Sequence, residues 1–150
     1  MSSWRTKRSH VWTLAVLVVV PLAALWADTA PSDWKAPARA ARKKNPIAAD
    51  EASQSAGKAV YAKECLSCHG VAGKGDGTAA KDLEKKPGDL SKPEMWDQTD
   101  GALFWKITEG RKPMPSFEKS LGEDQRWSAI NFVRTLAPKP ASPLAGDPAK

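Results

Sequence analysis

The sequence predicts a small all-α domain over residues 50 to 137. Apolar residues recur at helical spacing in three stretches of this region, and two of these stretches follow residues that can cap a helix. The region has no sustained run of β-branched residues, which would predict a sheet. The core of a domain of about 88 residues gives only marginal stability, so we expect something else to stabilise the fold.

The chain starts with a segment that is typical of exported proteins. Basic residues at positions 5, 7 and 8 precede an uncharged apolar run over residues 11 to 26. This pattern directs the rest of the chain across a membrane, so residues 1 to 27 are interpreted as a signal peptide or a retained membrane anchor. As a helix the run would be about 24 Å long, against a hydrocarbon core of about 30 Å. We favour membrane association through residues 11 to 26, with the domain in the periplasm or on the outer face of the cytoplasmic membrane.

Two further segments flank the predicted domain. Residues 28 to 49 are rich in Ala, Pro, Lys and Arg and show no apolar periodicity, which predicts a flexible linker. Residues 138 to 150 have the same character and predict a disordered tail.

The net charge of +6 is carried by the flanking segments. Residues 1 to 49 hold eight Lys and Arg against two Asp, whereas residues 50 to 137 hold thirteen basic and fourteen acidic side chains. A nucleic-acid-binding protein needs positive charge on its folded face, so nucleic acid is excluded as a partner. We expect the basic linker to keep the chain soluble or to lie near anionic lipid headgroups.

The first predicted helix of the domain covers residues 50 to 66. It places Gly57, Val60, Tyr61 and Cys65 on one stripe. A glycine inside a helix costs about 1 kcal/mol relative to alanine, so Gly57 predicts a close crossing with another helix.

Both cysteines of the chain lie in the stretch Cys65-Leu-Ser-Cys68-His69. The spacing C-x-x-C-H is the attachment signature of a c-type haem, in which a helical turn presents two thiols to the vinyl groups and the next residue places an imidazole under the iron. Structural zinc needs four N or S ligands, and the chain beyond residue 27 offers only three. A thioredoxin-like pair would need a preceding strand. A plain disulfide would leave His69 unexplained.

Hydrolytic and phosphate-binding functions fit the sequence poorly. His69 is the only histidine beyond residue 27, so its use as an iron ligand leaves no histidine to act as a general base, and we expect no enzyme activity of this class. The glycine-rich residues 70 to 77 lack the Ser or Thr that a phosphate-binding loop needs after Lys74. We interpret them as a flexible turn.

The second predicted helix ends at Gly110 and starts at Thr99 or Asp100, either of which can cap it. A methionine that could be the sixth ligand of a haem iron follows it. Met114 stands between Pro113 and Pro115, which limit the freedom of the loop. The other candidate, Met95, has no such constraint and is interpreted as core packing.

The last predicted helix runs to residue 136 and stops before Pro138. It begins near residues 120 to 123, which fit a capping box, although Gly122 could be the cap instead. Its buried face comprises Trp127, Ala129, Ile130, Val133 and Leu136.

Residues 57 to 136 resemble a class I monohaem cytochrome c of the bacterial type. The resemblance rests on C-x-x-C-H-G-x-x-G-x-G-D-G over residues 65 to 77, on Pro-Gly-Asp-Leu over residues 87 to 90 and on GRKPMPSF over residues 110 to 117. It implies a small class I cytochrome c fold, whose helices wrap around one covalently bound haem. The family also places the last helix across the first one, against Gly57 and Tyr61.

The resemblance also implies a set of site residues. Cys65 and Cys68 would hold the haem, and His69 and Met114 would ligate its iron. A proline carbonyl often accepts a hydrogen bond from the second nitrogen of the proximal histidine in this family, and Pro87 is the candidate here.

The implied function is electron transfer in a respiratory or periplasmic redox chain, as a carrier or a haem subunit with protein redox partners. One alternative is a haem enzyme or sensor in which Met114 dissociates and a small molecule binds the iron. Another is a purely structural subunit of a membrane complex.

Overall fold

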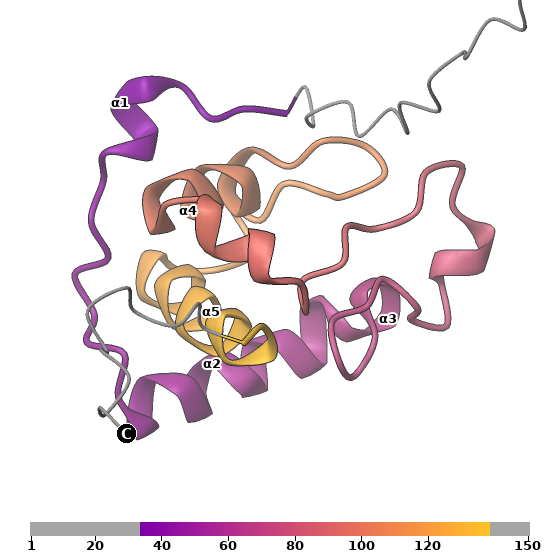
Figure 1. Ribbon diagram of the computed structural model, residues 1–150, viewed down its shortest axis with the longest axis horizontal. Coiled ribbons are helices and arrows are strands. Elements are labelled where there is room, and N and C mark those ends of the chain that lie inside the picture. The colour runs from indigo at the N-terminus through magenta and orange to yellow at the C-terminus, as the bar shows by residue number, and fades with distance from the viewer. Residues whose placement is uncertain (1–33, 139–150) are drawn as a thin grey trace, which may run out of the picture. The chain divides into compact units, whose positions relative to one another are not determined.

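The computed structural model describes residues 34–138, and every regular element among them is a helix (Figure 1). Within this range there is no β-strand, only an isolated bridge between Arg111 and Met114, so the predicted all-α class is confirmed. None of the described helices is long and apolar enough to cross a bilayer. The elements are α1 (Ala38–Ala41), α2 (Glu51–Glu64), α3 (Leu66–His69), α4 (Asp100–Glu109) and α5 (Glu123–Leu136), with 3-10 turns η1 (Ala80–Asp82) and η2 (Pro93–Asp97).

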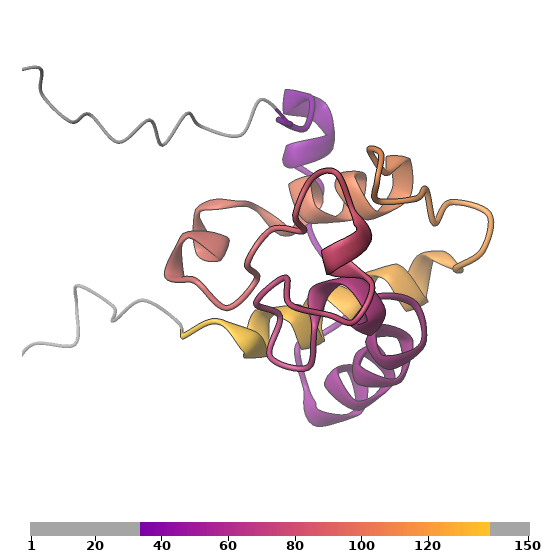
Figure 2. The same cartoon turned by 90° about the vertical axis from the view of Figure 1, so that its right-hand side faces the viewer.

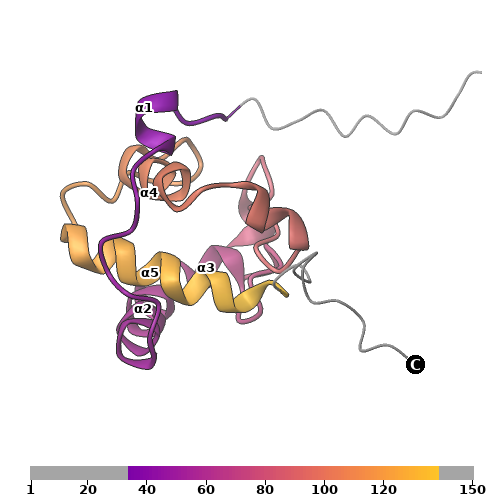
Figure 3. The ribbon, with the colours of Figure 1, turned by 60° about the vertical axis from the view of Figure 1, so that its left-hand side comes forward.

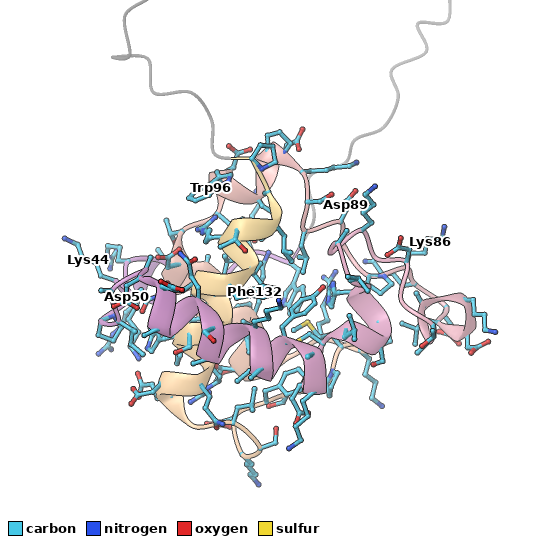
Figure 4. The ribbon with its side chains drawn as sticks, turned by 90° about the horizontal axis from the view of Figure 1, so that it is seen from below. Lys44, Asp50, Lys86, Asp89, Trp96 and Phe132 are labelled. Atoms are coloured by element: carbon cyan, nitrogen blue, oxygen red, sulfur yellow. The ribbon has the colours of Figure 1, made fainter. Side chains whose placement is uncertain are left out.

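The central contact is the crossing of α2 and α5, which Figures 1 and 3 show from two sides. A Cβ atom at Gly57 would lie 1.9 Å from the carbonyl oxygen of Ser128, so only glycine lets the two backbones approach this closely. One turn further along α2, the ring of Tyr61 packs against Phe132 with 5.2 Å between centroids. Figure 4 shows Phe132 where α5 passes over α2. The close crossing predicted from Gly57 is confirmed.

The helix α4 packs on the other side of α5. Phe104 stacks on Trp127 with 3.9 Å between ring centroids, and Ile130 is completely buried beside them. Arg134, on α5, donates to the Asp100 carboxylate at 2.8 Å and to the Met95 carbonyl at 2.6 Å. These bonds fix the start of α4 and the η2 turn to α5.

Each of the three long helices starts at a defined cap. The side chain of Asp50 accepts from the Ser53 amide at 2.8 Å at the start of α2, and Thr99 accepts from the Ala102 amide at 3.2 Å at the start of α4. Gly122 is the cap of α5, and its amide donates to the Gln125 side chain at 2.9 Å. The sequence left the caps of α4 and α5 open between alternatives, and the structure has Thr99 at α4 and Gly122 at α5.

Residues 34–49, which we name the strap, differ from the expected linker. Asn45 donates to the Asn131 side chain at 2.8 Å, and Thr99 donates to the Ala41 carbonyl at 2.6 Å. A Cβ atom at Gly101 would lie 2.3 Å from the Ala40 carbonyl oxygen. The strap is therefore packed against α4 and α5. Polar side chains and backbone groups make these contacts, so the strap lacks the apolar periodicity from which packing could be predicted.

The remaining segment predictions fall mostly outside the described residues. The signal peptide or anchor of residues 1 to 27, the linker up to residue 33 and the tail from residue 139 all lie there.

Candidate functional site

The Cys-His motif forms the helical turn that its spacing predicts. Cys65 joins α2 to α3, and its amide donates to the Tyr61 carbonyl at 2.9 Å while its own carbonyl accepts from the His69 amide at 2.9 Å. Cys65 and Cys68 are both half-buried, and their thiols are not joined in a disulfide. One short turn thus carries two thiols and an imidazole.

The protonation of Cys65 argues against a nucleophilic or disulfide-exchanging thiol. Burial, followed by the charges of Glu64 and Cys68, raises the pKa of Cys65 to about 11. Reactive thiols in redox pairs have lowered pKa values, because the thiolate is the nucleophile. The thiol of Cys65 is therefore protonated at neutral pH, which argues against redox exchange.

The imidazole of His69 is in the form that binds a metal. Burial lowers the pKa of His69, and the backbone of Gly88 raises it by a smaller amount. A lowered pKa favours the neutral ring, and a neutral imidazole nitrogen is a metal ligand. The Nδ1 atom is buried without a hydrogen-bond partner among the described residues.

The Pro87 carbonyl, the expected acceptor of a hydrogen bond from His69, lies close to Gly75, where a Cβ atom would be 2.4 Å from its oxygen. The backbone group that raises the pKa of the imidazole belongs to the neighbouring Gly88. No signal in the sequence separates these two adjacent residues, because both belong to the same Pro-Gly-Asp-Leu stretch.

The glycine-rich residues 70 to 77 form a tight, hydrogen-bonded turn beside the motif. Gly70, Gly73 and Gly75 have φ of 78°, 72° and 71°, which only glycine adopts readily. The Gly75 amide donates to the His69 carbonyl at 2.9 Å, and the buried Tyr61 hydroxyl donates to the Gly70 carbonyl at 2.7 Å. These bonds fix the position of α3 relative to α2.

The loop that follows α4 is drawn in orange in Figure 2. Met114 belongs to this loop by its position in the sequence. Paired hydrogen bonds of 3.0 Å and 2.9 Å between the backbones of Arg111 and Met114 close a turn. Phe117, buried further along, anchors the loop through its amide, which donates to the Ile107 carbonyl at 3.1 Å. Met114 itself is half-buried, so its thioether is held on a fixed loop without being packed in the core.

Met95 has the surroundings of a core residue. Its side chain is only 6% exposed and belongs to the main apolar cluster. Its sulfur accepts a hydrogen bond from the side-chain amide nitrogen of Gln98 at 3.8 Å. Both observations agree with the interpretation of Met95 as core packing.

The available donor set fits a c-type haem and does not fit a metal bound by side chains alone. Among residues 34–138, no three His, Cys, Asp or Glu side chains cluster closely enough to hold a metal ion. The motif instead offers two thiols for covalent attachment and one neutral imidazole for iron. The strap is the part near this domain that sequence reasoning missed, since its contacts depend on polar residues such as Asn45.

Comparisons with known proteins point to c-type cytochromes. The family described as "Cytochrome C oxidase, cbb3-type, subunit III" matches residues 52–133, more than half of the chain. A cytochrome c6 from Gloeothece citriformis is 36% identical over 83 residues, which cover 55% of this chain and 71% of that protein.

A solved structure agrees with these sequence matches. A chain of the Kuenenia stuttgartiensis reducing HAO-like protein complex superposes with a TM-score of 0.56 and 33% sequence identity over 62% of this chain. The match covers 47% of that chain, so the present chain spans about half of its length.

Proposed function

The chain belongs to the c-type cytochrome family described as cytochrome c oxidase, cbb3-type, subunit III, and on this premise we propose that it transfers electrons through a single haem c with His69 and Met114 as axial ligands. The observation that carries the proposal is the single helical turn that bears two thiols and a neutral imidazole. When bound, the haem supplies an iron that cycles between the ferrous and ferric states.

The role of each residue follows from its surroundings. Cys65 and Cys68 hold the haem covalently. Their helical turn, α3, is fixed in place by α2 and by the glycine-rich turn. His69 ligates the iron through one nitrogen. Its buried Nδ1 then needs an acceptor, and the adjacent carbonyls of Pro87 and Gly88 are the candidates. A hydrogen bond to either would orient the ring and strengthen the imidazole as a ligand.

Met114 is the sixth ligand in this proposal. Its half-buried thioether is carried by an anchored turn between two prolines, whereas the sulfur of Met95 already accepts a hydrogen bond inside the core. An iron with both positions filled by protein is suited to electron transfer rather than to small-molecule chemistry.

Loss of the thiols tests the attachment. The wild-type haem should stay on the polypeptide through denaturation and acid-acetone extraction. Cys65→Ala and Cys68→Ala should each leave at most one thioether and a low yield of matured protein, and Ser67→Ala, between them, should mature normally. Extractable haem in the wild type, or two thioethers in either cysteine variant, would refute the proposal.

The alternative of a haem enzyme or sensor requires Met114 to leave the iron. Slow or absent carbon monoxide binding by the reduced wild type supports the electron carrier. Rapid binding would favour the alternative. A haem that redox partners cannot reduce would instead point to a purely structural subunit.

We further propose that the chain is exported and acts at the outer face of the cytoplasmic membrane, held by residues 11 to 26, with proteins as electron donor and acceptor. The basic start and the uncharged apolar run support this location. Mass spectrometry of the mature protein tests the tether. A mature N-terminus at Asp28 would show that the segment is removed.

A further inference from the structure

The strap brings positive charge onto the folded domain. Residues 34–49 contain five Lys and Arg and no acidic residue, whereas residues 50 to 137 are close to neutral. A flexible linker would have kept this charge apart from the domain. Because Asn45 and Ala41 are hydrogen-bonded to α5 and to the cap of α4, the charge lies on the domain's own surface.

Only one of the five Lys and Arg residues of the strap is used in packing. Lys43 forms an ion pair with Glu123 at 3.1 Å and lies 4.8 Å above the ring of Phe104. The other four are exposed, and none of them forms an ion pair with an acidic side chain of residues 34–138. These four, which we name the strap cations, are Lys35, Arg39, Arg42 and Lys44.

The start of the strap is also the point where the chain leaves the described domain. Trp34 lies against two further cationic side chains, 5.3 Å from the Lys106 ammonium and 5.1 Å from the Arg111 guanidinium. Seven residues separate Trp34 from the apolar run that ends at residue 26. Fully extended, such a connection spans about 25 Å. A bilayer that held the apolar run would therefore keep the strap within reach of its headgroups.

We propose that the strap is a docking face for an anionic lipid bilayer, on which the strap cations contact phospholipid headgroups and orient the domain. The inference rests on the membrane attachment proposed above. Cationic side chains are attracted to anionic headgroups, and this attraction falls off within a Debye length of about 8 Å at physiological ionic strength. A loose tether would bring its own charges to the headgroups without orienting the domain, whereas a strap packed on α4 and α5 presents them together with the domain.

The test uses the mature, haem-loaded protein reconstituted in vesicles of phosphatidylcholine, with or without phosphatidylglycerol. One readout is the rate at which an amine-reactive reagent labels Lys35 and Lys44. The other is energy transfer from a headgroup-attached fluorophore to the haem. With phosphatidylglycerol, labelling of both lysines should slow by about tenfold and energy transfer should rise, and high salt should reverse both changes.

Two variants that lose the same number of positive charges distinguish a docking face on the strap from attraction of the whole domain to anionic lipid. The strap variant changes Lys35, Arg39, Arg42 and Lys44 to Gln, and the control variant changes Lys58, Lys81, Lys85 and Lys86 to Gln. Figure 4 shows Lys44 and Lys86 at opposite sides of the molecule. The strap variant should lose the salt-dependent rise in energy transfer, and the control variant should keep it.

Three results would overturn the proposal. One is the same labelling rate of Lys35 and Lys44 with and without phosphatidylglycerol. The others are the same loss of energy transfer in both variants, and protection of the two lysines only when an acidic redox protein is added. Flotation of the same sample with phosphatidylcholine vesicles reports the membrane attachment on which the proposal rests, and the labelling readout does not depend on haem. A failure of docking is thus distinguishable from a failure of the attachment and from a failure of the proposed electron transfer.

Discussion

The two methionines of the described domain differ in what surrounds their sulfur atoms. Met95 is almost fully buried, and Gln98 donates a hydrogen bond to its thioether. Met114 is half-buried on a turn that its own backbone closes with Arg111. Moving the Met95 sulfur to an iron would disrupt the core, whereas the half-buried Met114 is not packed in the core.

Substitution of Met114 should therefore separate fold from function. Met114→Ala should keep haem attached at Cys65 and Cys68, let carbon monoxide bind the reduced iron, and lower the reduction potential within the range of about 0.8 V that axial ligands cover. Redox titration measures the potential, and the far-red sulfur-to-iron band of the ferric protein reports the ligand.

Met95→Leu is the matched control, since it keeps the core volume and removes only the other sulfur. It should leave the band and the potential unchanged. If the band persists in Met114→Ala and disappears in Met95→Leu, the ligand assignment is wrong.

Gly57 offers a second test on a single residue. A Cβ atom there would lie 1.9 Å from the Ser128 oxygen and 2.5 Å from its carbonyl carbon, and backbone cannot move aside as a side-chain tip can. Gly57→Ala gains about 1 kcal/mol of helix propensity. The overpacking costs more, so we expect a net loss of about 2 kcal/mol in the free energy of unfolding.

Denaturant unfolding of the haem-loaded protein measures this loss. Ser55→Ala, at an exposed position of the same helix, should change the free energy of unfolding by less than about 0.5 kcal/mol. A stability of Gly57→Ala equal to that of the wild type would mean that α2 and α5 do not cross as closely as described.

Among the elements, the strap depends on two asparagines. Asn45 donates to Asn131, and its own side-chain oxygen accepts from the Ile47 amide at 2.9 Å. Asn131 is buried and donates to the Ala48 carbonyl at 3.1 Å and the Ser53 hydroxyl at 3.0 Å. The two amides thus link the strap, the start of α2 and α5.

Removing one of these amides should loosen the strap specifically. Asn45→Ala leaves the buried Asn131 oxygen without its donor, which should cost about 1–3 kcal/mol. Trypsin should then cut faster after Arg42 and Lys44, while the haem spectrum stays the same. Gln54→Ala, which removes only an exposed hydrogen bond of 3.4 Å to Ala49, should be cut at the wild-type rate. Equal cutting of the two variants would contradict the role of Asn45.

The strap also marks the limit of what the sequence could predict about the elements. The three long helices were predictable because apolar spacing and caps are local signals, and Gly57 even pointed to the α2–α5 crossing. The strap has no such spacing, since its contacts are side-chain amides and backbone carbonyls contributed by distant residues. At the site, the motif predicted the turn, but the choice between Pro87 and Gly88 depends on the path of a long loop.

At the scale of the whole molecule, the stability of the fold at alkaline pH depends on Tyr61, which also contacts the glycine-rich turn of the site. Its hydroxyl is buried and donates to Gly70, so it fixes the glycine-rich turn to α2. Burial, followed by the charges of Cys65 and Asp76, raises the pKa of Tyr61 to about 12. Once Cys65 is alkylated it carries no charge, so burial and Asp76 are then the causes that remain.

The raised pKa predicts an alkaline limit of stability. Tyrosine in the unfolded chain ionises near pH 10 and in the folded domain near pH 12, so its contribution is fully present below pH 10 and is lost as the pH rises towards 12. The full shift corresponds to about 2–3 kcal/mol, which is an upper limit for the haem-loaded protein because the Cys65 charge no longer contributes. Unfolding free energies of the wild type and Tyr61→Phe, measured from pH 8 to pH 12, isolate the effect because lysine deprotonation is common to both. The difference between them should be constant up to about pH 10 and shrink above it. A difference that stays constant up to pH 12 would show that the hydroxyl is not buried in the folded protein.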